Sequence, residues 1–252
     1  MRRFFILFNR EMAFYFHSPL AYVVLFFFLL ITGFNFYAGV LLLNQAAGTE
    51  VTMVQAFFNT GFFWSSFILV FPLITMRLFS EEYKMGTIEP LMTAPVHDLQ
   101  VILAKFASAL MFYIILWLPS LLYFIVFEWQ SSHQAADAAG AYIGSYTMLL
   151  LMGMFYVSIG CLASSLTKNQ IVAAIISIVA IMLMFFMGFL TFIIQSYSAT
   201  LQDLTAYLSP IRHMMDYSQG IFDSRPVVFY LSMTFFMLFL TFHAFQRRRW
   251  TS

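Results

Sequence analysis

Long apolar runs separated by short polar segments dominate the chain. A helix needs about 20 apolar residues to cross the hydrocarbon core of a bilayer, which is about 30 Å thick, because each residue adds about 1.5 Å. Continuous apolar runs of this length favour helices over barrel strands, in which apolar and polar residues alternate. We therefore predict an all-α membrane protein with six transmembrane helices, organised as a single domain over residues 1–252. Six runs without Asp, Glu, Lys or Arg support this prediction: residues 20–43, 57–76, 106–127, 142–166, 171–194 and 227–245.

The first 17 residues have a different pattern, in which apolar and polar positions recur at roughly helical spacing. Such a pattern is typical of an amphipathic helix that lies in the headgroup plane of a membrane. We predict an interfacial helix over residues 1–17, and we expect it to be retained, since no small-residue signal-peptide cleavage site follows it. Its apolar face holds Phe5, Phe8, Met12, Tyr15 and Phe16, and its polar face holds Arg2, Arg3, Asn9, Arg10 and His17.

Composition narrows the class of protein further. Of the 252 residues, 62% are hydrophobic, 20% aromatic and 9% charged, and the mean hydropathy is +0.85. Soluble domains are nearer to about 45–50% apolar and about 25% charged. The net charge of +1 gives no bulk attraction to nucleic acid. These values exclude an ordinary soluble enzyme, a disordered protein and a nucleic-acid binder.

Basic residues are distributed unevenly between the two ends of the predicted spans. In membrane proteins, Lys and Arg concentrate in the short cytoplasmic loops. With both termini on one side, only Arg212 and Arg225 lie on the other side. We therefore predict that both termini and the 77–98 loop are cytoplasmic, and that the 195–226 loop is external. We expect an external hairpin before the last span, and apolar residues at helix-like spacing after Pro210 indicate that it lies against the membrane or caps the bundle. The ten basic residues on the predicted cytoplasmic side are Arg2, Arg3, Arg10, Arg77, Lys84, Lys105, Lys168, Arg247, Arg248 and Arg249.

Sequence motifs for catalysis are absent from the chain. It contains no GxxxxGK[ST] motif for binding nucleotide phosphates, no HExxH zinc motif and no GxSxG nucleophile motif. We therefore expect no catalytic residue, no bound metal and no cofactor on this chain.

Polar residues inside the spans have two interpretations. Small polar side chains commonly pack and hydrogen-bond between membrane helices. They could instead line a translocation path, and we take Asn35, Ser65, Ser66 and Ser158 as the candidates. A third interpretation, an intramembrane enzyme, requires Asn35 to converge with Ser65 or Ser158 at one depth.

The 77–98 loop has the most informative local pattern. Its sequence RLFSEEYKMGTIEPLMTAPV, residues 77–96, begins with clustered charges and breaks at Gly86 and Thr87. The spacing then places Ile88, Leu91 and Met92 on one helical face. We predict a short amphipathic helix that projects from the bundle into a groove of a soluble partner. The competing interpretation is a loop that lies on the membrane surface.

The same loop resembles the coupling segment of ABC type-2 transporter permeases. A second match, Leu208-Ser209-Pro210 with His213, Gly220 and Asp223, resembles the gliding-motility-type subgroup of that family. Pro90 departs from the pattern, because leucine is usual there. The matching loop residues are Glu81, Glu82, Gly86, Thr87, Glu89, Leu91, Pro95 and Val96.

This resemblance implies a permease subunit of an exporter-like ABC transporter in a bacterial inner membrane. Two permease chains, identical or different, would pair with two copies of a separate ATPase subunit, which would bind ATP and Mg. The 77–98 loop would form the coupling helix, and residues 1–17 would brace the same interface. The expected ATPase contacts are Glu81, Glu82, Gly86, Thr87, Ile88, Glu89, Leu91 and Met92. The resemblance also allows a mechanotransmitting or scaffold subunit that carries no solute, and it names no substrate.

Overall fold

The computed structural model describes residues 2–45, 51–88, 96–130, 139–193, 205 and 207–251. Within these ranges all regular secondary structure is helical, as predicted. The helices are α1 (Arg2–His17), α2 (Pro19–Gln45), α3 (Met53–Phe58), α4 (Gly61–Thr75), α5 (Ser80–Met85), α7 (Asp98–Gln130), α8 (Ala139–Leu166), α9 (Gln170–Ile193), α11 (Pro210–Ser218) and α12 (Ser224–Thr251).

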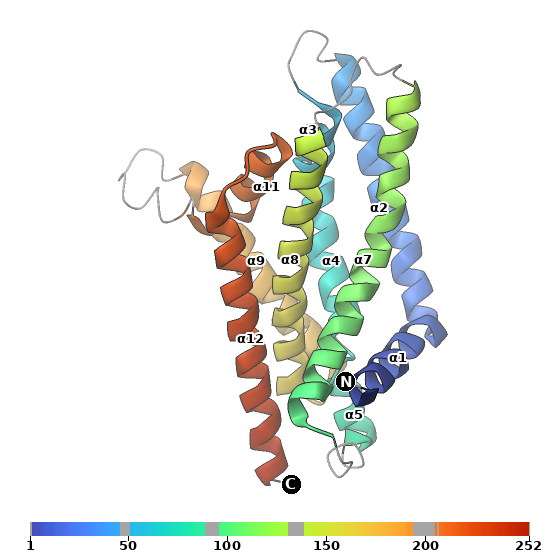
Figure 1. The fold of residues 1–252 in the computed structure, drawn as a ribbon, viewed down its shortest axis with the longest axis vertical. Helices are drawn as coiled ribbons and strands as arrows, with labels where there is room; N and C mark the ends of the chain where they lie inside the picture. The colour runs from blue at the N-terminus through green and yellow to red at the C-terminus, as the bar shows by residue number, and fades with distance from the viewer. Residues whose placement is uncertain are drawn as a thin grey trace.

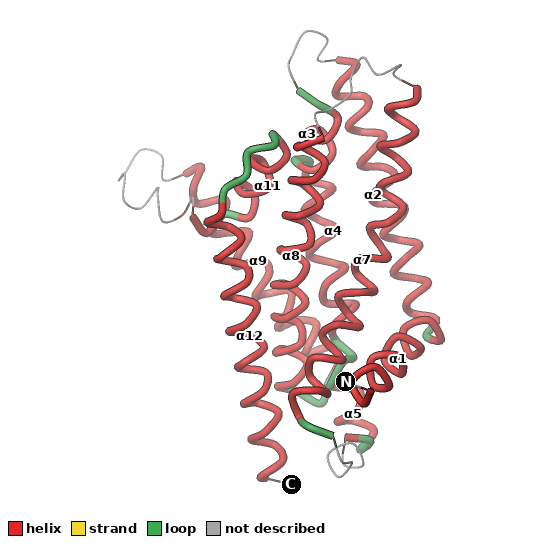
Figure 2. The backbone as a smooth tube through the Cα atoms, viewed as in Figure 1, coloured by secondary structure: helices red, strands yellow, loops and turns green. Residues whose placement is uncertain are grey.

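Six long helices form an elongated bundle, shown in Figures 1 and 2. These helices are α2, α4, α7, α8, α9 and α12, and each is long and apolar enough to cross a membrane. The prediction of six spanning helices is therefore confirmed. Both chain termini, α1 and α5 lie at one end of the bundle, whereas α3 and α11 lie toward the other (Figure 1). We call these the termini end and the opposite end.

The bounds of the spans differ from the predicted ones, and in two spans the structure shows the reason. The run predicted at 57–76 is interrupted at Asn59 and Thr60, because Thr60 caps the start of α4 by accepting a hydrogen bond from the Phe63 N–H. The third span begins at Asp98 rather than at residue 106. Lys105 therefore lies inside a helix, where its side chain is only 2% exposed.

Helix α1 runs obliquely across the ends of the long helices (Figure 1). Its inner side includes the buried residues Leu7 and Glu11. The Tyr15 hydroxyl donates to the Ile74 carbonyl at 2.8 Å, and the Tyr15 ring stacks on Phe112 with centroids 4.8 Å apart. These contacts attach α1 to α4 and α7.

The two faces of α1 differ in part from the predicted ones. Arg3 and Arg10 are exposed, and Phe8 and Met12 are half-buried. Phe5, which was assigned to the same face as Phe8, is 57% exposed. The side of α1 that packs against the bundle includes the acidic residue Glu11. Apolar character alone therefore did not identify the packed side.

Helix α8 lies at the centre of the bundle and is buried along much of its length. Three of its glycines allow close approach of other elements. A Cβ atom at Gly160 would overlap the Thr75 side chain of α4, and one at Gly153 would overlap the Tyr113 ring of α7. A Cβ atom at Gly144 would overlap the Tyr217 carbonyl of α11. Since protein interiors are close-packed, these glycines fix the distances between α8 and its neighbours.

Candidate functional site

The short helix α5, at the termini end, is the centre of the candidate site. It stops at Gly86, whose φ of 71° lies in the left-handed region. Glycine adopts this conformation readily because it has no Cβ atom, which explains the helix end. Glu81 and Glu82 occupy the first turn and Lys84 the last, an order that complements the helix dipole. The break predicted at Gly86 is therefore confirmed.

A serine of the central helix α8 holds the beginning of α5. The Ser164 hydroxyl accepts hydrogen bonds from the backbone N–H groups of Phe79 and Ser80, at 3.0 and 3.1 Å. It also donates to the Met76 carbonyl at 3.1 Å. One hydroxyl thus uses its donor and both acceptor positions on the segment that leads into α5.

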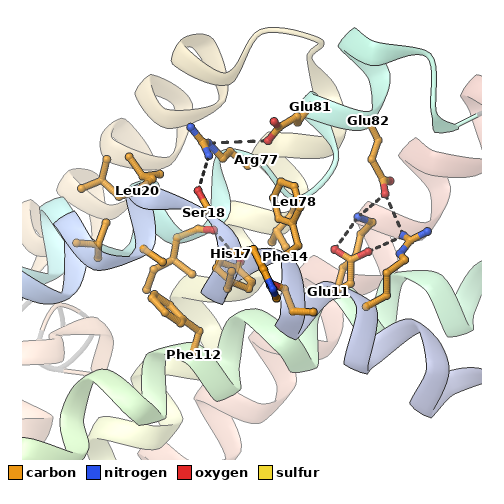
Figure 3. A pocket seen from close by; sticks show the side chains of 18 of the residues that line it. Glu11, Phe14, His17, Ser18, Leu20, Arg77, Leu78, Glu81, Glu82 and Phe112 are labelled. Carbon is orange, nitrogen blue, oxygen red and sulfur yellow. Dashed lines mark hydrogen bonds and ion pairs between the residues drawn. The ribbon is translucent and has the colours of Figure 1, made fainter.

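A cluster of four charged side chains connects α5 to α1 and α7 (Figure 3). The Lys105 Nζ lies 3.2 Å from Glu11 Oε2 and 3.1 Å from Glu82 Oε1. The Arg10 Nη2 lies 2.6 Å from Glu11 Oε1 and 3.1 Å from Glu82 Oε1. Each carboxylate therefore contacts both basic groups, and the cluster carries no net charge. We call these four residues the charge cluster.

Glu11 is ionised in this environment. Burial alone would raise the pKa of its carboxyl group, but Lys105 and Arg10 outweigh burial through their charges and hydrogen bonds. The pKa of Glu11 consequently lies below its ordinary value. Breaking a buried ion pair by removing one partner is strongly destabilising, because the other charge remains buried without compensation.

Phe79, directly before α5, connects the charge cluster to the last span. Its side chain is fully buried. The Lys105 ammonium lies 5.4 Å from the centroid of its ring, in a cation–π arrangement. The Phe245 ring of α12 packs against it with centroids 5.9 Å apart.

Four helices therefore hold α5: α8 through Ser164, α1 and α7 through the charge cluster, and α12 through Phe79. A force on α5 would reach most of the bundle directly, because these contacts are made by residues of α5 itself or by Phe79, directly before it.

The contact residues predicted from the sequence fall into three groups. Glu81 and Glu82 are turned toward the protein, where Glu81 faces Arg77 with Oε2 and Nε 3.9 Å apart. Gly86 and Thr87 are exposed, and Ile88 is buried. Glu89, Leu91 and Met92 lie outside the described residues.

The candidate lining residues form hydrogen bonds within their own helices or with a neighbouring segment. Asn35, Ser66 and Ser158 are buried, whereas Ser65 is exposed. The Asn35 amide donates to the Phe57 carbonyl at 2.9 Å and its oxygen accepts from the Thr60 hydroxyl. The three serines each donate to a carbonyl of their own helix. These contacts are typical of helix packing.

The opposite end of the bundle contains a buried histidine. His213 of α11 lies 3.3 Å from the Tyr230 hydroxyl of α12. Burial lowers the pKa of His213 to about 4, although Asp223 acts in the other direction. Among the residues that the structure describes, no three His, Cys, Asp or Glu side chains are grouped so that they could hold a metal ion.

Sequence reasoning missed two members of the charge cluster. Lys105 was counted among the loop charges, and Glu11 was given no role. Glu11 carried a detectable signal, since it lies four residues from Leu7 and from Tyr15, on their side of α1. A charged residue within a packed stripe indicates a buried partner of opposite charge.

Comparison with known sequences gives one match. Residues 18–185 match the sequence model of a family described as "ABC-2 family transporter protein". The match covers more than half of the chain and includes the first four spanning helices, α5 and most of α9. No curated protein matches the chain.

Proposed function

The chain belongs to the ABC-2 family of transporter proteins, and we propose that it is the transmembrane permease subunit of an ATP-driven, exporter-like ABC transporter. A separate ATPase subunit, which binds ATP and Mg, supplies the energy. The absence of a GxxxxGK[ST] motif from these 252 residues supports this division of labour.

The single observation that carries the proposal is the anchoring of α5. An energy-transmitting helix must contact its partner at one point and be fixed to the spans at others. Gly86 and Thr87 are exposed, while Ser164, Phe79 and the charge cluster fix α5 to four helices. ATP-driven closure of the ATPase subunits would displace α5, and the attached spans would move with it as rigid bodies.

The same arrangement supports an orientation. Ten of the Lys and Arg residues belong to the termini end, where α5 lies. We therefore place this end in the cytoplasm, facing the ATPase, with the protein in a bacterial inner membrane. Residues 1–17 lie at the membrane interface beside the ATPase, and the 195–226 segment lies outside.

The complex contains two permease chains and two ATPase subunits. Each permease needs a partner to enclose a translocation path. Large apolar side chains remain exposed on α2, α9 and α12, including Phe34, Phe186 and Phe235. These surfaces face lipid or the second permease chain, which is identical or closely related.

Site-directed cross-linking tests the proposed contact. The native Cys161 is buried and is the chain's one cysteine, so cross-links will form at an introduced exposed cysteine rather than at Cys161. We expect Thr87→Cys to cross-link to the ATPase subunit in membranes that contain both proteins. Ile221→Cys, which is 54% exposed near the opposite end, is the matched control and should give no cross-link. Equal cross-linking at both positions, or none at position 87, would contradict the proposal.

A transport assay separates a transporting permease from a mechanotransmitting or scaffold subunit. In the second case the ATPase contact at Thr87 would persist, but no solute would accumulate in inverted vesicles supplied with ATP.

A further inference from the structure

A cavity of about 440 Å³ opens at the termini end, between α1, α2, α4, α5 and α7. It includes Thr87 at the exposed tip of α5 that we assign to the ATPase, but its other lining residues lie on α1, α2, α4, α5, α7, the junction of α1 and α2 and the 76–79 turn. Its lining changes character along its length. Charged side chains from α1, α5 and α7 and from the 76–79 turn surround one part, and apolar side chains from the spans surround the other (Figure 3).

The charges at the polar end balance. Three basic groups, Arg10, Arg77 and Lys105, meet three carboxylates, Glu11, Glu81 and Glu82. A net anion would gain little from this lining, because each attraction to a basic group is opposed by a neighbouring carboxylate. A ligand with one positive and one negative group would fit it better.

Within the polar end, Arg77 and Glu81 keep unused hydrogen-bonding capacity. Their Nε and Oε2 atoms are 3.9 Å apart, too far for a hydrogen bond. Both atoms are buried, and neither has a hydrogen-bond partner among the described residues. The Arg77 Nη1 does donate to the Ser18 hydroxyl at 3.0 Å, which holds the guanidinium beside the junction of α1 and α2 (Figure 3).

Both side chains line the cavity and are 30% and 24% exposed, so a ligand there can reach the polar atoms that remain accessible beside this pair. Arg77 can only donate hydrogen bonds, and the Glu81 carboxylate can only accept them. The complementary ligand must therefore accept at Arg77 and donate at Glu81. A phosphate joined to a primary ammonium does both, whereas a phosphate alone would add a second anion beside Glu81.

The apolar end matches the remainder of an amphiphile. Leu20 and Val24 of α2, Leu73 of α4 and Phe112 of α7 line it, together with Phe14 of α1, which is 48% exposed. Since α1 is amphipathic and crosses the ends of the spans, this cavity lies where lipid headgroups meet acyl chains.

We propose that this cavity binds one phospholipid with a phosphoethanolamine headgroup, whose phosphate contacts Arg77 and whose ammonium contacts Glu81. The lipid is a resident ligand that fills the junction of α1 with the spans. This inference goes beyond the proposed function, because the site needs neither an ATPase nor a transported solute.

Native mass spectrometry of the delipidated full chain, titrated with defined lipids, tests the site. We expect one phosphatidylethanolamine to bind at least tenfold more tightly than phosphatidylglycerol, which lacks the ammonium. Phosphatidylcholine should also bind several-fold more weakly, since its trimethylammonium has the same charge but no N–H to donate. Equal or tighter binding of phosphatidylglycerol, or no stoichiometric lipid, would overturn the proposal.

Two variants assign the binding to the cavity. Glu81→Gln should weaken phosphatidylethanolamine binding about tenfold and remove its advantage over phosphatidylcholine, whereas Arg77→Gln should weaken all three lipids. Lys84→Gln is the matched control, because Lys84 is exposed on α5 and does not line the cavity. If Arg77→Gln fails to fold, the lipid preference of Glu81→Gln still shows whether the cavity is the binding site. An unchanged lipid preference in a folded Glu81→Gln protein would contradict the site and leave the ATPase contact at Thr87 unaffected.

Discussion

The two ends of the helical bundle are held together by different interactions. At the termini end, the charge cluster joins α1, α5 and α7 through ion pairs, of which the Lys105–Glu11 pair is buried. At the opposite end, neutral contacts predominate: the Asn59 amide donates to the Ser218 hydroxyl at 3.2 Å, and His213 lies beside Tyr230. Gly144 there lets α8 approach the Tyr217 carbonyl directly.

This difference suits two mechanical roles. Charged pairs can exchange partners while remaining satisfied, because Glu11 and Glu82 each contact both Arg10 and Lys105. Close backbone packing, by contrast, has no alternative arrangement of similar energy. We therefore expect the termini end to rearrange when α5 is displaced and the opposite end to move as a rigid unit.

Removing the central cation of the charge cluster should have the largest effect on stability. Lys105→Met leaves the buried Glu11 and the half-buried Glu82 with Arg10 as their shared partner, so we expect a loss of about 3–5 kcal/mol. Thermal unfolding in detergent measures it. The exposed Lys84→Met is the control and should change stability by less than about 0.5 kcal/mol.

A double variant shows whether the loss comes from uncompensated charge. Lys105→Met combined with Glu11→Gln leaves Arg10 paired with Glu82 alone, so it should be more stable than Lys105→Met by at least about 1 kcal/mol. If the double variant is less stable than the single one, lost packing of the lysine side chain explains the effect better than charge.

Acid should weaken the opposite end through His213. Its pKa is lowered from 6.5 to about 4 in the folded protein, so between these values the unfolded chain binds more protons. The stabilisation is complete above about pH 6.5 and is lost as the pH falls toward 4. It amounts to about 3–4 kcal/mol at most, at about 1.4 kcal/mol per pKa unit.

Stability measured at several pH values between 4 and 7 checks this prediction. His213→Gln should flatten the pH dependence in this range, and His97→Gln, whose side chain is exposed, should leave it unchanged. A slope that persists in His213→Gln would assign the acid sensitivity to other groups, among which Glu11 acts at lower pH because its pKa is below the ordinary value.

Much of the fold could be predicted from hydrophobic pattern alone. A membrane-spanning helix is determined by a local property, the apolar length of its segment, so all six spans were found. The bounds of the spans were less predictable. Thr60 interrupts one apolar run because it caps a helix, and the third span extends past Lys105 because this lysine pairs with the Glu11 and Glu82 carboxylates. Both effects depend on contacts with particular side chains or backbone groups, and the hydropathy of a local segment carries no information about such contacts.

The candidate site was predictable only in part. Its position followed from Glu81, Glu82 and Gly86, which are adjacent in sequence. The residues that hold it did not, since Ser164 is 84 and 85 positions from the amides it binds and Lys105 is 94 positions from Glu11. Such pairs are set by packing, as are the close contacts of the α8 glycines.

Enlarging one of these glycines should destabilise the packing of α8 against its neighbours, by a smaller amount than the change at Lys105. Gly160→Ala places a methyl group against the Thr75 side chain, which is fully buried, so we expect a loss of about 1–3 kcal/mol. Gly61→Ala is the control, because a Cβ atom there has no neighbour within 4 Å. Unfolding midpoints of the two variants in the same detergent measure the difference, and equal midpoints would contradict the close approach.

The smallest expected change in stability removes the bond between α8 and α5. Ser164→Ala leaves the buried N–H groups of Phe79 and Ser80 without their acceptor, which costs about 1–2 kcal/mol. Ser165→Ala is a closely matched control, since that hydroxyl donates only to the Leu162 carbonyl of its own helix. Hydrogen exchange at residues 79 and 80 should accelerate in Ser164→Ala and not in Ser165→Ala.

If α5 transmits force through α8, Ser164→Ala should also lower substrate transport per ATP hydrolysed while the Thr87 contact with the ATPase persists. Unchanged transport with faster exchange would mean that the charge cluster and Phe79 carry the force without Ser164.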